Sequence, residues 1–316
     1  MVKTIIDVHS HIVPQNYVAA LERNGRLLED GFPCPKWSME SQYAFMESVG
    51  IRHCVLSVSS PHQMVGSLEE GLQLTRELNE EMARMVKDDP AAFSFAACLP
   101  LPLVEESVVE AVRALDELGA CAVKFPSNAD GLYPGDEALA PLMDVLNERR
   151  AVVLLHPCKP PVVPQNCYTA GPLPLFEFLG DTTRAVINLL TAKVADRWPN
   201  VRFIVPHSGS FLPPLVDRLT GMTRAMAANG KGAAVDVRAA LQNFYFDLAG
   251  DALPAAVPAL LKITTPDHLL FGGDFPYTPP HMVQEHIDAL RNDLQTAPYA
   301  EGIFCENARK LLHLPE

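Results

Sequence analysis

The chain has 316 residues, of which 48% are hydrophobic, 20% charged and 7% aromatic, and this globular composition excludes disordered, collagen-like and low-complexity chains. Lysine and arginine number 25 against 38 aspartates and glutamates, which gives a net charge of −13. So acidic a chain repels phosphate backbones and anionic lipid, and we therefore expect neither a nucleic-acid nor a membrane partner. A small anionic substrate stays compatible with this charge, because local cations or a metal ion can reverse the field inside a cleft.

The seven cysteines lie far apart and form no CxxC pair, so the sequence predicts neither a zinc ribbon nor a redox dithiol. The opening segment MVKTIIDVHSHIVP is a poor secretory signal, because Asp7 interrupts its short apolar run. A membrane-spanning helix needs about 18 apolar residues in a row, and the sequence contains no such run. We expect a cytoplasmic protein with reduced cysteines.

Nearly continuous hydrophobic runs alternate with helical patterns along the chain, as in a parallel sheet that is buried on both faces. The expected strands are residues 4–12, 53–59, 93–101, 121–126, 151–156, 201–207, 244–248 and 269–275. The expected helices are residues 67–86, 104–118, 138–149, 182–198 and 252–262, the first with Ser67 as its N-cap. Eight strands that alternate with helices predict a (β/α)8 TIM barrel rather than a doubly wound sheet. No glycine-rich nucleotide-binding motif follows the first strand.

The length would allow two domains of about 150 residues each, but single barrels of about 250 residues are common. We expect one domain, residues 1–316. Residues 16–36 and the proline-rich residues 157–174 interrupt the alternation, and each segment follows a strand. We therefore expect two long loops at the mouth of the barrel, where long loops are often functional lids.

Metal-binding residue types recur at the ends of the expected strands. His9 and His11 alternate along the first strand, so both face the barrel interior and can grip one cation. His156, His207 and Asp274 each end another apolar strand. Because the carboxyl ends of barrel strands form the site face, these five side chains are expected to converge. A histidine pair alone could arise by chance, but a purely structural role for all five is a poor explanation.

This residue set predicts a mononuclear metal site. His9, His11 and His156 supply neutral nitrogen ligands and Asp274 a carboxylate oxygen, which favours Zn2+, with Mn2+ or Fe2+ as alternatives. One position must stay open for water or substrate. His207 is expected to act as the acid and base, the alternative being a further ligand in a binuclear site.

Longer stretches of the chain agree with one known family. The five residues, in this order, resemble those of the amidohydrolase superfamily, specifically its α-amino-β-carboxymuconate-ε-semialdehyde decarboxylase-like branch. The supporting segments are TTRAVINLLTAKVADRWPNVRFIVPHSGSFLPPLVDRLTG at 182–221, NFYFDL at 243–248 and LFGGDFP at 270–276. The PKW segment at 35–37 and the SN pair at 127–128 are similar to members that act on 6-methylsalicylate. The resemblance extends from Ile6 to about Leu312.

The resemblance implies a (β/α)8 fold, a divalent metal that is usually zinc, and decarboxylation without an organic cofactor. It implies His9, His11, His156 and Asp274 as metal ligands and His207 as the acid and base. Family dimers lend an arginine across the interface, and its position would correspond to Arg218, for which a surface ion pair is the alternative.

Two further residues have open alternatives. Trp37 is expected either to wall an aromatic substrate or to pack within its loop. Asp247, at the end of the seventh expected strand, is expected either to support a metal ligand or to serve the structure alone.

The predicted function is that of a metal-dependent, non-oxidative decarboxylase acting on a small aromatic or muconate-like carboxylic acid, in a homodimer or larger homo-oligomer. Asp274 would deliver the proton to carbon, which requires either a raised pKa or a proton handed to it by another group. The main alternative is a hydrolase of lactonase or amidase type, in which a metal-bound hydroxide attacks a carbonyl. A binding module without activity would need a degraded metal site.

Overall fold

The computed structural model describes residues 4–163 and 171–314. Within these residues, eight parallel strands follow one another in chain order around a single sheet. The strands are β1 (Ile6–Ile12), β2 (His53–Val58), β3 (Phe93–Cys98), β4 (Ala122–Pro126), β5 (Val152–His156), β6 (Arg202–Val205), β7 (Phe244–Asp247) and β8 (Leu269–Leu270). The predicted (β/α)8 barrel is confirmed.

The sheet closes because the chain around and after β8 bonds to β1. The Val8 amide donates to the Phe271 carbonyl at 3.0 Å, and the His11 amide donates to the Phe275 carbonyl at 2.8 Å. A register shift interrupts the pairing of β1 with β2 between Asp7 and Ser10. Such a bulge re-aims side chains locally, here in the strand that carries His9 and His11.

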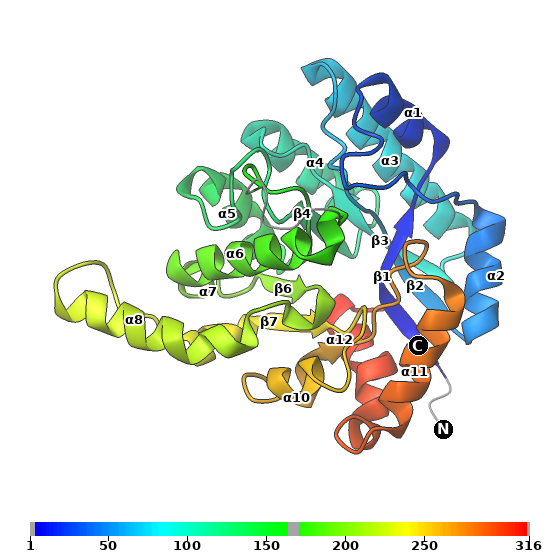
Figure 1. Ribbon diagram of the computed structural model, residues 1–316. Coiled ribbons are helices and arrows are strands. Elements are labelled where there is room, and N and C mark those ends of the chain that lie inside the picture. Colours follow the sequence, from blue (N-terminus) through cyan, green and yellow to red (C-terminus); the bar gives the residue numbers. More distant parts are fainter. Residues whose placement is uncertain (1–3, 164–170, 315–316) are drawn as a thin grey trace.

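Helices cover the outside of the barrel, and one of them, α8, projects away from it (Figure 1). They are α1 (Gln15–Arg23), α2 (Met39–Val49), α3 (Leu68–Asp88), α4 (Val104–Asp116), α5 (Ala140–Glu148), α6 (Glu177–Thr191), α7 (Val194–Arg197), α8 (Val216–Ala228), α9 (Val237–Ala240), α10 (Ala256–Leu260), α11 (Pro280–Asn292) and α12 (Asn307–Leu312). In the described part of the chain, no helix is both long and apolar enough to span a bilayer.

The helices match the expectations in part. Ser67 caps α3 as predicted, because its side chain accepts a hydrogen bond from the Glu70 amide. The helix expected at 182–198 is two helices, α6 and α7, since Lys193 between them adopts a left-handed φ of 56°. The loop expected at 16–36 is wrong in its first part, which is α1. Of the loop expected at 157–174, residues 164–170 lie outside the described part of the chain.

Two of the strands that carry site residues end earlier than expected. β6 ends at Val205 and β8 ends at Leu270, so His207 and Asp274 follow these strands instead of ending them. The physical reason is backbone conformation. His207 and Asp274 have positive φ angles of 53° and 57°, which an extended strand cannot contain.

The barrel interior is filled with apolar side chains at the amino ends of the strands. This inner cluster combines strand residues with side chains from α12 and the turn before it: Ile6, Val8, Val55, Ala96, Ala122, Val152, Leu154, Ile204, Leu270, Cys305, Ala308, Leu311 and Leu312. The C-terminal helix therefore closes the amino end of the barrel. The carboxyl ends of the strands remain as the face for a site, as in other barrels of this type.

Asn79 of α3 ties that helix to the site end of β3. Its buried side chain accepts from the Cys98 amide at 2.8 Å and donates to the Cys98 carbonyl at 2.9 Å. We expect Asn79→Ala to lower the free energy of unfolding by about 2–3 kcal/mol, because both backbone groups lose their partner inside the protein. The exposed Asn292→Ala should change it by less than about 0.5 kcal/mol. Urea denaturation measures both, and equal losses would contradict the role of Asn79.

Candidate metal centre

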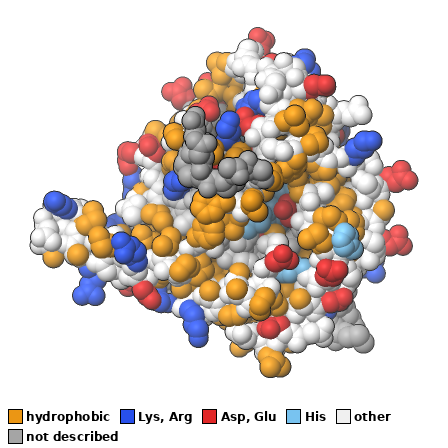
Figure 2. Space-filling model, in the orientation of Figure 1, with side chains coloured by type: hydrophobic (Ala, Val, Ile, Leu, Met, Phe, Trp, Pro, Cys, Tyr) orange, Lys and Arg blue, Asp and Glu red, His pale blue; other side chains and the backbone are white. Residues whose placement is uncertain are grey.

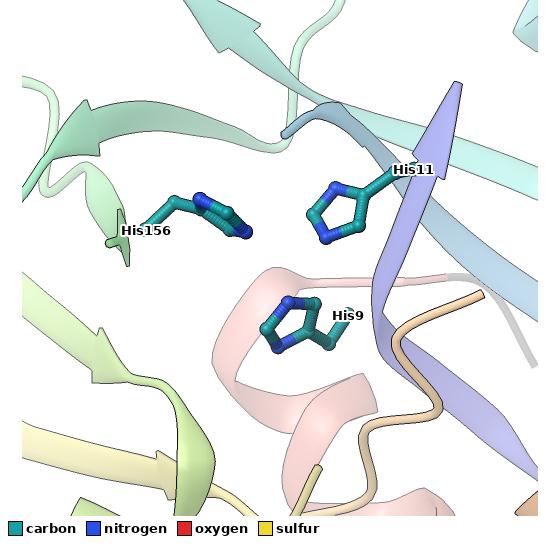
Figure 3. Close-up of side chains that lie close together, drawn as sticks. All are labelled: His9, His11 and His156. Carbon is teal, nitrogen blue, oxygen red and sulfur yellow. The ribbon is translucent and has the colours of Figure 1, made fainter. Parts of the chain in front are cut away.

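Three imidazole rings face one another inside the barrel mouth (Figure 3). His9 and His11 come from β1 and His156 from the last position of β5. The ring centroid of His11 lies 4.8 Å from that of His9 and 4.7 Å from that of His156. All three side chains are buried, so residues far apart in the sequence form one compact cluster.

The other two predicted residues join this cluster. One ring nitrogen each from His9, His11 and His156 lies within 4.8 Å of the other two. One nitrogen each from His9 and His207 and one carboxylate oxygen of Asp274 form a second group within the same distance. Asp274 Oδ1 is 3.5 Å from His9 Nε2 and 3.2 Å from His11 Nε2, while its Oδ2 is 3.7 Å from His207 Nε2. The structure therefore brings together all five residues, with Asp274 between the triad and His207.

The backbone is strained where two of these residues stand. His207 and Asp274 adopt left-handed φ angles that residues with a side chain rarely adopt, at a cost of about 1–3 kcal/mol each. Hydrogen bonds hold both in place: the Asp274 amide donates to the His9 carbonyl at 2.7 Å, and the His207 amide donates to Asp247 Oδ1 at 3.1 Å. Strain of this kind persists at functional positions when the surroundings fix it.

Asp247 supports the cluster from the end of β7. Its Oδ2 is 3.0 Å from His9 Nδ1, and its Oδ1 accepts from the amides of His207 and Ala249. A carboxylate on Nδ1 orients the imidazole and leaves Nε2 as its ligand atom. Asp247 thus holds both the ring of His9, a candidate ligand, and the backbone of His207, the candidate acid and base.

The Nδ1 atoms of the other two rings are also engaged. His11 Nδ1 lies 3.0 Å from Ser57 Oγ, and His156 Nδ1 donates to the Pro157 carbonyl at 2.8 Å. The Nε2 atoms of His9 and His11 are buried without a hydrogen-bond partner among the described residues, and His156 Nε2 has only a long contact of 3.4 Å with Ser59 Oγ. Buried imidazole nitrogens without partners, next to a carboxylate, fit a divalent cation.

The charges of the cluster agree with this fit. Burial lowers the pKa of His11 to about 4 and that of His156 well below its usual value, so both rings are neutral, as metal ligands must be. Burial also disfavours a charge on His9, but Asp247 and Asp274 outweigh it and raise the His9 pKa to about 9. The two carboxylates therefore favour one positive charge at this point, which a proton or a metal ion supplies.

The pKa of Asp274 is held well below its usual range. Burial raises it, but the charge of His9 and the nearby Nε2 atoms of His11 and His207 together outweigh burial. Of the two conditions for Asp274 to act as an acid, a raised pKa is therefore not met. Asp274 can carry a proton only when a neighbouring group passes one to it.

A cavity of about 810 Å³ opens above the cluster, a suitable size for a small organic ligand. Figure 2 shows histidine and acidic side chains at the bottom of a hollow whose rim is largely hydrophobic. Its polar floor includes Ser59, His156, His207 and Asp274. Its apolar walls include Phe32, Phe178, Leu179, Phe211, Pro214 and Ala256, and no lysine or arginine is among the described lining residues.

The two predicted substrate-binding residues lie elsewhere in this chain. Trp37 is half-buried beside the core between the strands and helices, donates from its indole to Gln42 Oε1 at 3.0 Å, and is not among the described residues that line the cavity. Arg218 is exposed on α8 and is likewise absent from that lining.

Sequence reasoning missed several polar residues at the site, among them Ser57 beside His11 and the cavity-lining Asp30 and Tyr277. The available signals were positional. Tyr277 lies in the segment that follows Asp274, and Asp30 lies in the long segment after the first strand, which was expected at the mouth.

The amidohydrolase family model matches residues 6–314, nearly the whole chain. The chain belongs to the amidohydrolase family. A solved amidohydrolase II is 35% identical with a TM-score of 0.92, covering 98% of this chain and 100% of the other. The 6-methylsalicylic acid decarboxylase of Aspergillus aculeatus is 33% identical over 95% of this chain and 92% of the relative.

The same barrel occurs in a dihydroxybenzoic acid decarboxylase from a Polaromonas species, solved with bound manganese and the inhibitor 2-nitroresorcinol. It is 19% identical, with a TM-score of 0.83, and the match covers 99% of this chain and 97% of the other. At this identity the likeness concerns the fold. The family and the fold expected from the sequence are both confirmed.

Removal of one imidazole should remove the metal. We expect the purified protein to hold about one divalent metal ion per chain and His11→Ala to hold far less after dialysis, because one of few nitrogen ligands is lost. His281→Ala, which alters an exposed histidine away from the cavity, should keep the metal content of the unaltered protein. Elemental analysis by mass spectrometry gives the ratio of metal to chain, and full metal content in His11→Ala would remove His11 from the ligand set.

Proposed function

We propose that this amidohydrolase is a metal-dependent carboxy-lyase that releases carbon dioxide, without oxidation, from a small aromatic or muconate-like carboxylic acid. The observation that carries the proposal is the position of His207 and Asp274 beside the histidine triad, at the floor of an apolar cavity. The likeness to a 6-methylsalicylic acid decarboxylase over nearly the whole chain supports the same reaction.

His9, His11, His156 and Asp274 would hold the metal, which we propose to be Zn2+ because three neutral imidazoles and one carboxylate suit it, with Mn2+ or Fe2+ as alternatives. When bound, the metal supplies positive charge that orients the substrate carboxylate and neutralises it. The apolar walls exclude water from the reacting carbon, which strengthens the electrostatic interactions of the floor.

Loss of carbon dioxide leaves an electron pair on carbon, so for an aromatic acid the ring carbon that bears the carboxylate must first gain a proton. His207 takes a proton from a phenol hydroxyl or a water and passes it to Asp274, whose Oδ2 is 3.7 Å from His207 Nε2. Asp274 then protonates the ring carbon. The carbon–carbon bond breaks, its electron pair returns to the ring, and carbon dioxide leaves.

A substrate panel tests this function. Hydroxybenzoates, dihydroxybenzoates and 6-methylsalicylate are incubated with the enzyme in added zinc or manganese, and released carbon dioxide is measured together with the phenol formed. We expect equal amounts of carbon dioxide and phenol from at least one acid. Hydrolysis of lactones or amides, with no carbon dioxide from any acid, would overturn the proposal in favour of a hydrolase.

His207→Ala should separate catalysis from metal binding. We expect it to keep its metal and lose about 10²–10⁴-fold in turnover, because the group that moves the proton is gone. The exposed His281→Ala serves as the matched control and should keep its rate. Metal content and initial rate are measured on the same preparation. Loss of metal in His207→Ala would make His207 a ligand instead.

We also propose that two copies of this single domain, residues 1–316, form a homodimer through α8. This helix projects from the barrel, and Val216 is its only buried residue in the structure described (Figure 1). It exposes Met222, Met226 and Arg218. An arginine delivered from α8 to the partner's cavity would supply the cation that the described lining of each chain lacks, and would bind the substrate there.

Mixing two inactive variants tests this arrangement. If Arg218 serves the partner's site, the Arg218→Ala dimer and the His207→Ala dimer should each have low activity. Mixing equal amounts with exchange of subunits should restore activity at about a quarter of the sites. The restored site pairs an intact His207 with the Arg218 of the other chain. Arg224→Ala, an exposed arginine on the same helix, is the control and should stay active alone. Absence of recovery in a proven mixed dimer would place Arg218 outside the partner's site.

For its location we propose the cytoplasm. The six cysteines within the described residues are all free thiols, which supports a reducing compartment.

A further inference from the structure

Asp30 is a buried carboxylate at the cavity that the proposed chemistry does not use. It lies between α1 and α2, only 4% of its surface is exposed, and it lines the cavity together with Phe32 and Tyr277. A carboxylate that is buried next to a ligand cavity needs a partner to offset its lost hydration. Its surroundings therefore indicate what kind of ligand group it meets.

The position of Asp30 is fixed from three sides. Ser60 Oγ donates to Asp30 Oδ1 at 3.1 Å, and the backbone carbonyl of Asp30 accepts from the Leu173 amide at 2.9 Å. The next residue, Gly31, has a φ of 93°, and a Cβ there would meet Pro172 Cα at 2.8 Å, so only glycine allows this close approach. The carboxylate is thus held in place before any ligand arrives.

One acceptor atom of this carboxylate has no partner in the described part of the chain. Oδ2 receives no hydrogen bond there and is not among the unpartnered atoms that are sealed from solvent. Arg26 and Lys159 lie near enough to lower the Asp30 pKa, but within the described residues neither forms an ion pair with it. Burial raises the pKa of Asp30 to about 6, so at neutral pH the group is mostly ionised and can only accept hydrogen bonds.

Asp30 belongs to the same wall as the histidine cluster. Ser60, its donor, directly follows Ser59, whose Oγ is 3.4 Å from His156 Nε2. The Tyr277 hydroxyl donates to the Ser60 carbonyl at 3.3 Å, and the Tyr277 ring packs edge-on against His11 with 5.6 Å between centroids. A ligand seated on the histidines therefore lies against the wall that presents Asp30.

We propose that Asp30 determines substrate specificity by accepting a hydrogen bond from a hydroxyl substituent of the aromatic acid and by repelling a second carboxylate at that ring position. This inference rests on the proposed function and narrows its substrate class to monocarboxylic acids with a hydroxyl group facing Asp30. A buried acceptor discriminates strongly, because an analogue without the proton leaves it unpaired. No cation in the described lining offsets the repulsion of a second carboxylate.

Binding of matched, unreactive ligands tests the inference. The ligands are 2-nitrophenols, in which a nitro group stands for the carboxylate, with a hydroxyl, methoxyl or carboxyl group added at each remaining ring position. Titration calorimetry gives their affinities for the metal-loaded protein and for Asp30→Asn. Asp88→Asn removes one exposed carboxylate outside the cavity lining and is the matched control for charge. Metal content and thermal midpoint establish that each variant is folded and loaded.

At one ring position, the unaltered protein should bind the hydroxyl ligand about 10- to 100-fold more tightly than its methoxyl counterpart. Asp30→Asn should reduce this ratio by about 10-fold or more and bind the carboxyl ligand more tightly, while Asp88→Asn keeps the ratio. Should Asp30→Asn fail to fold, Ser60→Ala, which frees the carboxylate from its donor, should lower the ratio instead. The inference would be overturned if a folded Asp30→Asn protein kept the same ratio of hydroxyl-ligand to methoxyl-ligand affinity. It would also be overturned if the unaltered protein preferred the hydroxyl ligand at no ring position. Carbon dioxide release is scored separately, so a failed decarboxylase assay is not confused with a failed role for Asp30.

Discussion

The site depends on the closure of the sheet between β1 and the chain that follows β8. Asp7 Oδ1 accepts from the amides of His9 and Gly273, and the Asp274 amide donates to the His9 carbonyl. These bonds join β1 to the segment that follows β8, at the level of the histidines. Because Asp274 is held by the backbone of His9, the carboxylate and the first imidazole cannot separate without opening the barrel. The geometry of the candidate metal centre is therefore a consequence of the fold's last pairing.

Charge balance follows from that pairing. Asp247 and Asp274 flank His9 inside a buried site, where two carboxylates without a cation are unfavourable. His11 and His156 stay neutral because burial lowers their pKa values, so they do not supply the missing charge. A proton on His9 or a divalent cation supplies it, and only the cation would also use the nitrogens that lack partners. The same balance lowers the pKa of Asp274, so in the proposed reaction its proton has to come from His207.

The floor and the walls of the cavity differ in chemistry. The floor carries the proposed metal ligands and the proposed acid and base, whereas the apolar walls and the carboxylate of Asp30 are the groups proposed to select the ligand. These groups come from segments after β1, β5, β6 and β7, and such βα connections can vary without disturbing the barrel. A single barrel can thus keep one decarboxylation chemistry while its loops change the acid that it accepts.

The sequence by itself determined the strand and helix alternation, the barrel, the family and the five residues of the centre. Each depends on a local pattern: apolar runs of strand length, alternate histidines on one strand, and polar residues after apolar runs. Only the tertiary structure decided where strands end at His207 and Asp274, that Ser57 and Asp247 hold the imidazoles, and that Asp30 lines the cavity while Trp37 does not. These features depend on left-handed backbone angles and on contacts between residues far apart in the chain. Periodicity carries no information about such contacts, because it describes which face of an element is buried and not what lies against it.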